Sequence, residues 1–149
     1  MDPTDRAILR HLQADARLTN VELAERVRLS PSPCLRRVRA LERAGVIRGY
    51  HADIDPAAAG RGFEVTVHVE LTLKDRATVE AFEAGIAALD EVLECRRMFG
   101  LPDYLVRVAV ADQAAYEAFY MNELAELPGL GRVNSQFTMK MVKRGPLPL

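Results

Sequence analysis

Arginine and serine side chains gather on one face of a helix that the sequence predicts over residues 31–43. At about 100° per residue, Ser32, Arg36 and Arg43 point to the same side, with Arg37 and Arg39 flanking them. A guanidinium group is a planar fork of N–H donors that grips a phosphate or the acceptor edge of guanine in a bidentate manner. The pattern therefore predicts contact with a nucleic acid, although an ordinary helix with a solvated basic face has the same pattern.

Two helices joined by a tight turn must position these side chains. Thr19 and Glu22 have the spacing of a capping box for the first helix, and residues 27–29 form the turn. Ser30 is the expected N-cap of the second helix, and Gly45 follows its last turn, where a left-handed cap is favoured. So short a connection is typical of the helix-turn-helix unit, whose second helix enters the DNA major groove.

The predicted DNA contacts fall into two groups by their position on this unit. The first group lies on the exposed face of the second helix, and the second group lies nearer the phosphates. The two groups are Ser32, Arg36, Arg37 and Arg39 on the face, and Arg28, Ser30, Arg43 and Arg48 toward the phosphates. Most protein–DNA hydrogen bonds go to the backbone, so phosphate contact is expected for the majority.

Charge is divided unevenly between the two parts of the chain. Residues 1–50 hold ten arginines and six acidic residues, a balance of +4, while residues 51–149 hold ten basic and fifteen acidic residues, a balance of −5. The overall net charge of −1 hides this division. Two modules are therefore expected, of which only the first meets a polyanion.

Composition excludes several classes of protein. The 149 residues are 49% hydrophobic, which suits a globular core, and no window approaches the roughly 18 apolar residues of a membrane span. Acidic residues near the N-terminus argue against a signal peptide, and the two cysteines, Cys34 and Cys95, do not form a disulfide or metal pattern. The three histidines are scattered. We therefore expect a cytoplasmic, nucleoid-associated protein with no metal site, no cofactor and no catalytic centre.

Periodicity predicts an α+β architecture of two domains, 1–50 and 63–149, joined by a linker over 51–62. A first helix starts at Asp2-Pro3 and packs across the helix-turn-helix pair, and Val46–Ile54 is expected to form a short strand or wing. Strands are expected over residues 63–73, 92–99, 104–110 and 133–143, with helices after Asp75 and Asp112. The order β-α-β-β-α-β is that of a ferredoxin-like sandwich, following a winged helix-turn-helix domain.

Three sequence runs carry a resemblance to a known family. The run NVELAERVRLSPSPCLRRVRALERAGVIRGY resembles the DNA-binding signature of the leucine-responsive regulatory protein/AsnC family of transcription regulators. Cys95, the run Gly100–Tyr104 and the run Leu127–Gly129 are similar to landmarks of that family's effector domain. The similarity extends over nearly the whole chain.

The resemblance implies partners and a second site. Members of this family form dimers through the C-terminal sheet and the linker strand, and the dimers assemble into tetramers, octamers or hexadecamers. Many bind a free amino acid at contacts between dimers and change assembly or DNA affinity in response. By position, one wall of that site is Gly100, Leu101, Pro102, Asp103 and Tyr104, and the other is Gln136, Phe137 and Thr138.

One departure leaves the effector response open. Family members commonly have a polar residue after the turn glycine, whereas this chain has Leu101, followed by Pro102, which lacks a backbone donor. Asp103 is retained, and its carboxylate can pair with an α-ammonium group. One alternative is that residues 100–103 form a plain hairpin turn and that the protein is an effector-independent, architectural DNA-binding protein. A second alternative is an enzyme built on the ferredoxin-like domain, but the sequence contains no acid/base or nucleophile pattern for it.

Overall fold

The computed structural model describes residues 1–143, 145 and 147–149, and these form two compact units. The N-terminal unit contains residues 1–53 together with the described residues of 143–149, and the sheet unit contains residues 54–142. The division at 53/54 falls within the linker predicted over 51–62. Residues 143, 145 and 147–149 belong to the N-terminal unit, whereas the predicted second domain extends over 63–149. Residues 144 and 146 of that predicted domain lie outside the described residues.

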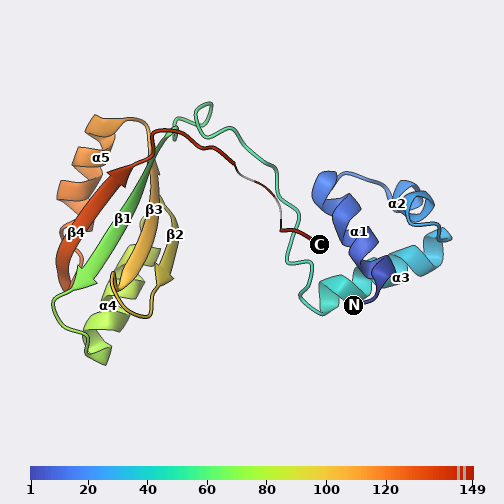
Figure 1. Cartoon of the computed structure of the whole chain (residues 1–149), viewed down its shortest axis with the longest axis horizontal. Helices are drawn as coiled ribbons and strands as arrows, with labels where there is room; N and C mark the ends of the chain where they lie inside the picture. The colour runs from blue at the N-terminus through green and yellow to red at the C-terminus, as the bar shows by residue number, and fades with distance from the viewer. Residues whose placement is uncertain (144, 146) are drawn as a thin grey trace. The chain divides into compact units, whose positions relative to one another are not determined.

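Three helices build the N-terminal unit: α1 (Pro3–Ala14), α2 (Asn20–Arg26) and α3 (Pro31–Arg43) (Figure 1). The predicted capping box at α2 is confirmed, because the Thr19 hydroxyl accepts the Glu22 N–H and the Glu22 carboxylate accepts the Thr19 N–H. Ser30 is the N-cap residue of α3, but its side chain makes no capping hydrogen bond. After α3, Gly45 takes the predicted left-handed conformation with a φ of 68°.

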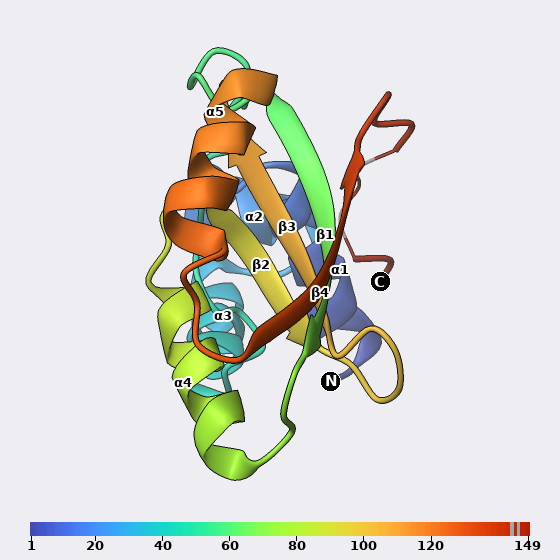
Figure 2. The same ribbon diagram turned by 90° about the vertical axis from the view of Figure 1, so that its left-hand side faces the viewer.

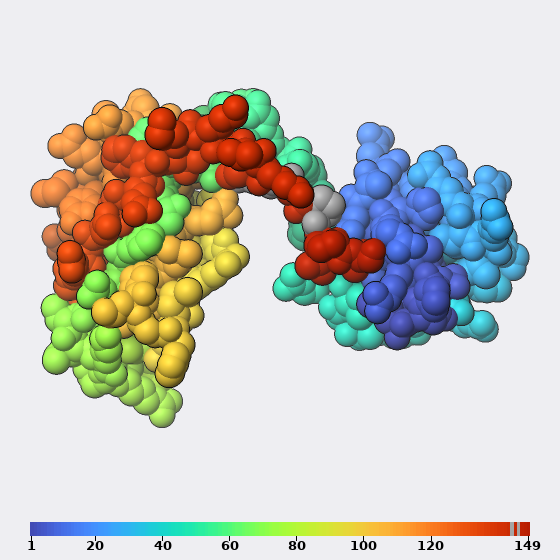
Figure 3. Space-filling model, viewed as in Figure 1, coloured from blue at the N-terminus to red at the C-terminus, as the bar shows by residue number. Residues whose placement is uncertain are grey.

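The helices enclose a small core to which the end of the chain adds. Its buried side chains are Ile8, Leu9, Leu23, Ala24, Cys34 and Leu41. Leu149 packs against this core, and Arg10 Nη1 donates to the Leu149 carbonyl at 3.5 Å. Figure 3 shows residues 147–149 lying on the surface of the N-terminal unit. Cys34 is therefore a packing residue, as predicted, and burial raises the pKa of its thiol.

The strand predicted over Val46–Ile54 is not formed, and this expectation was wrong for the single chain. Between α3 and the first strand of the sheet unit, the backbone is irregular. The N–H groups of Val46 and Ile47 both donate to the Leu41 carbonyl, which turns the chain back on the end of α3. A strand needs a neighbour for its backbone N–H and C=O groups, and no described strand pairs with residues 48–54.

The sheet unit is the predicted ferredoxin-like sandwich. Its four antiparallel strands lie in the order β2-β3-β1-β4, and the two helices cover one face of the sheet (Figure 2). The strands are β1 (Phe63–Leu71), β2 (Val92–Arg97), β3 (Tyr104–Val110) and β4 (Leu130–Phe137), and the helices are α4 (Arg76–Ala87) and α5 (Gln113–Phe119), which continues into a π-helical turn, η1 (Tyr120–Leu124). The predicted helix caps Asp75 and Asp112 are confirmed. Among the described residues, no helix is long and apolar enough to cross a bilayer.

Strict alternation along β1 explains the two faces. Val65, Val67 and Val69 are buried under the helices, while Thr66 and His68 lie on the uncovered face. The predicted fourth strand is too long, because β4 ends at Phe137 and Met139 is fully exposed beyond it. The Thr138 N–H donates to the Glu64 carbonyl, and β1 begins only one residue earlier, at Phe63, so little of β1 remains for the chain to pair with.

Candidate DNA-binding face and small-molecule pocket

The outward face of α3 is open to solvent and positively charged. Ser32, Arg36, Arg39 and Arg43 are all exposed, as predicted from the helical spacing. Within the described part of the chain, none of these three arginines makes an ion pair with an acidic residue. Their guanidinium groups are therefore available to an external polyanion.

Arg37 has a different role from its neighbours. Its Nη1 atom lies 2.7 Å from Asp2 Oδ2 and 2.8 Å from Asp5 Oδ1, so it ties α3 to the start of α1. The hydrogen bonds to Asp2 and Asp5 raise the pKa of Arg37. Arg37 is among the predicted DNA contacts, and the carboxylates that engage it here are Asp2, the N-cap residue of α1, and Asp5 in its first turn. Arg37 orients α3 while the other arginines stay free.

The Arg37 contacts predict how the stability of the N-terminal unit responds to acid. The Asp5 N–H, and then Arg37, lower the pKa of Asp2 below its ordinary value of 3.8. A lowered carboxyl pKa gives stability that is present above the unfolded value and lost as the pH falls through the folded value. We expect Arg37→Gln to lower the melting temperature slightly at neutral pH. Below about pH 4, the melting temperature of this variant is expected to fall less than that of the parent protein.

Thermal unfolding followed by helical circular dichroism, from neutral pH down to about pH 3, measures this difference. Arg39→Gln is the matched control, because Arg39 is an exposed arginine on the same helix without an ion pair in the described structure. Identical acid profiles for Arg37→Gln and the parent would show that the Asp2 and Asp5 contacts do not stabilise the folded unit.

The turn between α2 and α3 places the remaining predicted contacts. Arg28 is exposed and has a φ of 55°, an uncommon conformation for a residue with a side chain. Asn20, which the sequence analysis did not single out, donates from Nδ2 to the Pro31 carbonyl at 2.8 Å and so links the starts of α2 and α3. Ser30 and Arg48, at the two ends of α3, are exposed.

A pocket of about 520 Å³ lies at the turn between β2 and β3. Four of the five residues predicted for the first effector wall line it: Gly100, Leu101, Asp103 and Tyr104. Pro102 belongs to the same turn but not to the lining. The rest of the lining comes from the end of β1, the connection to α4, α4 itself, the end of β2 and the turn after it, namely Leu71, Lys74, Val79, Arg97, Met98 and Phe99.

Asp103 is the polar centre of this turn pocket. Its Oδ2 accepts the Leu71 N–H at 2.9 Å, and its Oδ1 lies 2.6 Å from Lys74 Nζ. Burial raises the pKa of Asp103, but the hydrogen bonds from Lys74 and Leu71 outweigh it, so the pKa lies below its usual value. Lys74 was missed by the sequence analysis, because it lies 29 positions before Asp103 and nothing in the local pattern joins the two. The turn pocket thus presents a carboxylate and an ammonium group side by side.

Tyr104 forms the wall between this pocket and the core. Its ring is 2% exposed and lies 4.7 Å from the Phe82 ring, centroid to centroid, and its hydroxyl donates to Glu83 Oε1 at 2.8 Å. Burial, with the Glu83 contact, raises the pKa of Tyr104 to about 12. Its hydroxyl is therefore engaged with α4.

The second predicted wall lies elsewhere in the sheet. Gln136 pairs with Thr66, whereas Tyr104 pairs with Val69, and the turn extends beyond Tyr104 in the opposite direction. Phe137 packs against Phe63, with ring centroids 5.1 Å apart. Gln136, Phe137 and Thr138 share no pocket with the Gly100–Tyr104 turn among the pockets described here, so a single chain does not bring the two predicted walls together.

These features define a class of protein: a DNA-binding module with an exposed arginine face, joined to an α+β sandwich that carries a small-molecule pocket. Comparison with known families agrees for both parts. Residues 1–48 match the model of a winged helix-turn-helix DNA-binding domain, and residues 64–148 match the Lrp/AsnC ligand-binding domain. The chain belongs to the Lrp/AsnC family and is a DNA-binding transcription regulator.

Relatives match over almost the whole chain. The leucine-responsive regulatory protein of Escherichia coli K12 is 40% identical over 144 residues, which cover 97% of this chain and 88% of that protein. A Neisseria meningitidis transcriptional regulator, solved in complex with L-methionine, is 40% identical with a TM-score of 0.94, covering 99% of this chain and 96% of that one. An AsnC family regulator from Agrobacterium tumefaciens is 39% identical with a TM-score of 0.94, covering 99% and 97%.

Proposed function

We propose that this regulator binds operator DNA through α3 and responds to a free amino acid held at the turn between β2 and β3. The observation that carries the proposal is the Asp103–Lys74 pair in the turn pocket, 2.6 Å apart, beside apolar side chains. An α-amino acid carries one positive and one negative group next to each other, which is the complement of this pair. We infer from the proposed DNA binding that the protein acts at the nucleoid in the cytoplasm.

The DNA half of the proposal follows from the exposed face of α3. Ser32, Arg36 and Arg39 are presented to the major groove, while Arg28, Ser30, Arg43 and Arg48 lie nearer the phosphates. A two-fold dimer presents two copies of α3 to half-sites one helical turn, about 34–36 Å, apart. Arg37 contributes by holding α3 in place through Asp2 and Asp5.

The effector half assigns a role to each side of the turn pocket. The α-ammonium group of the ligand pairs with Asp103 and its α-carboxylate with Lys74, replacing their direct contact. The ligand side chain lies against Val79, Met98 and Leu101, which favours an apolar amino acid. The L-methionine complex of the Neisseria relative supports this class of ligand. Leu101, where family members commonly have a polar residue, fits an apolar side chain.

We further propose that the chain works as a dimer that assembles into tetramers or octamers. The exposed, unpaired segment 48–54 becomes a strand when it pairs with a second chain, which supplies the missing backbone partners. Phe99 is fully exposed at the tip of the turn, and Met98 and Leu101 beside it are also exposed. Such an apolar cluster is typical of a subunit contact, and a neighbouring chain there provides Gln136, Phe137 and Thr138 as the second wall.

Thermal unfolding of the full chain in the presence of each of the twenty free amino acids tests the effector proposal. A ligand that binds only the folded state raises the melting temperature. At a free ligand concentration of a hundred times its Kd, it adds about 2.7 kcal/mol to the free energy of unfolding. We expect one or a few apolar amino acids, methionine and leucine first, to give this shift. If no apolar amino acid shifts the melting temperature at millimolar concentration, the effector-independent, architectural function replaces this proposal.

A further inference from the structure

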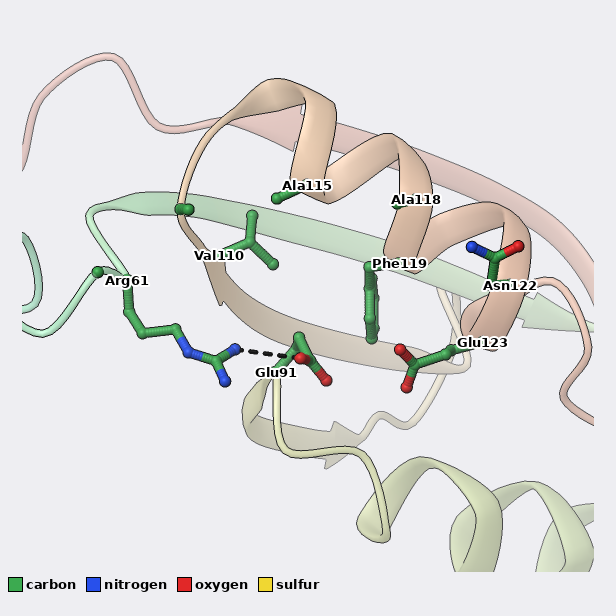
Figure 4. Close-up of a pocket in the computed structure, with 10 residues that line it drawn as sticks. Arg61, Glu91, Val110, Ala115, Ala118, Phe119, Asn122 and Glu123 are labelled. Atoms are coloured by element: carbon green, nitrogen blue, oxygen red, sulfur yellow. Dashed lines mark hydrogen bonds and ion pairs between the residues drawn. The ribbon is translucent and has the colours of Figure 1, made fainter.

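A second pocket, of about 340 Å³, lies on the helix-covered side of the sheet unit at the end of β3 (Figure 4). We call it the linker-side pocket, because Gly60 and Arg61 at the end of the linker form part of its wall. Its other walls include Glu91, Val110, Ala115, Ala118, Phe119 and Glu123. None of these residues lines the turn pocket, which lies at the other end of β3. The linker-side pocket is therefore a separate site.

Arg61 provides an anion-binding group at one end. Its Nη1 atom lies 3.3 Å from Glu91 Oε1 and donates to the Ala109 carbonyl at 3.1 Å. Both contacts use the same nitrogen, so the N–H groups of Nη2 and Nε remain for a ligand carboxylate. The contacts also fix the guanidinium in place, which lowers the entropy cost of binding an anion.

Glu123 provides a free carboxylate further into the pocket. It belongs to the π-helical turn η1, a distortion that occurs frequently at functional sites. Figure 4 shows its carboxylate directed toward Glu91, below the Phe119 ring. In the part of the chain that the structure describes, Glu123 makes no ion pair, so its charge is uncompensated.

The charges and the apolar wall together indicate the ligand. Two carboxylates and one guanidinium give the pocket a net charge of −1, which an amino acid with a positively charged side chain balances. Val110, Ala115, Ala118 and Phe119 form an apolar wall along which a methylene chain can lie. A neutral amino acid would leave the Glu123 charge unmatched, and a simple amine would leave the free N–H groups of Arg61 unused.

We propose that the linker-side pocket binds a basic amino acid of the lysine or ornithine type. Its α-carboxylate is held by Arg61, its α-ammonium group by Glu91, and its side-chain ammonium group by Glu123, while the methylene chain covers Phe119 and Ala118. Arg61 also closes the last turn of the linker, because its N–H donates to the Pro56 carbonyl at 2.7 Å. A ligand on Arg61 therefore orders the linker that leads to the DNA-binding unit, independently of the turn pocket.

Isothermal titration of the full chain with L-lysine, L-ornithine and L-arginine tests this inference. At least one of them is expected to bind at micromolar to millimolar concentration, and Glu123→Gln is expected to weaken that binding by about tenfold or more, because it removes the charge but keeps the shape. Glu117→Gln is the matched control, since Glu117 is exposed on α5 and does not line the pocket. The same titration is repeated on Asp103→Asn.

Binding that survives in Glu117→Gln and Asp103→Asn but is lost in Glu123→Gln supports the linker-side pocket. Binding that is lost in Asp103→Asn but kept in Glu123→Gln places the basic amino acid in the turn pocket and overturns the inference. Loss in both variants, or no binding of any of the three amino acids to the parent protein, overturns it as well. The response to apolar amino acids is measured on the same protein, so failure here is distinguishable from failure of the proposed effector function.

Discussion

Replacing Arg36 with alanine is expected to weaken binding to operator DNA by about 1–3 kcal/mol, which is roughly fivefold to 150-fold in Kd. Arg36 is exposed near the centre of the outward face of α3, and it makes no ion pair among the described residues that would compete with DNA. If Arg36 contacts a base edge, the loss depends on the operator sequence; if it contacts a phosphate, the loss is similar for all sequences. Fluorescence anisotropy with cognate and scrambled duplexes at fixed salt distinguishes the two.

Salt provides a second measurement on the same variant. Binding of the parent protein is expected to fall steeply as salt rises, because arginines on DNA release condensed counterions. Loss of one phosphate contact reduces the slope of log K against log salt by about one. Arg17→Ala serves as the control, since Arg17 is an exposed arginine of the N-terminal unit that lies between α1 and α2. Equal affinities for Arg36→Ala and the parent would remove Arg36 from the DNA interface.

Asp103→Asn is expected to abolish the rise in melting temperature that an apolar amino acid gives. Asparagine keeps the shape and can still accept the Leu71 N–H, but it lacks the negative charge that pairs with Lys74 and with the ligand ammonium. The variant is expected to lose all of the stabilisation that the ligand gives the parent protein, which is about 2.7 kcal/mol of unfolding free energy at a ligand concentration of a hundred times the parent Kd. Thermal unfolding with and without the amino acid measures it.

The control for this variant is Asp90→Asn. Asp90 is an exposed carboxylate in the connection between α4 and β2, outside the turn pocket. A ligand-induced shift in Asp103→Asn equal to that of Asp90→Asn would show that the amino acid does not pair with Asp103. The melting temperatures without ligand separate this result from a general loss of stability.

Short-range residue patterns were enough to predict most local elements and the exposed face of α3. The capping box of Thr19 and Glu22, the caps Asp75 and Asp112, and the left-handed Gly45 are short-range features, because each depends on residues within four positions. Alternation along β1 and helical spacing along α3 likewise depend only on neighbours in the chain. These patterns were sufficient for the fold class, the family resemblance and the position of Arg36.

Which charged groups meet depends on how distant parts of the chain pack together. Arg37 pairs with Asp2 and Asp5, and Asp103 pairs with Lys74, across separations of 29 to 35 positions. Residue periodicity also did not predict the length of β4 or the absence of a strand over 46–54. A strand forms only where another strand supplies hydrogen-bond partners for its backbone N–H and C=O groups. The two predicted effector walls lie apart, and Arg61 meets Glu91, for the same reason: packing of whole elements sets distances that local residue patterns do not contain.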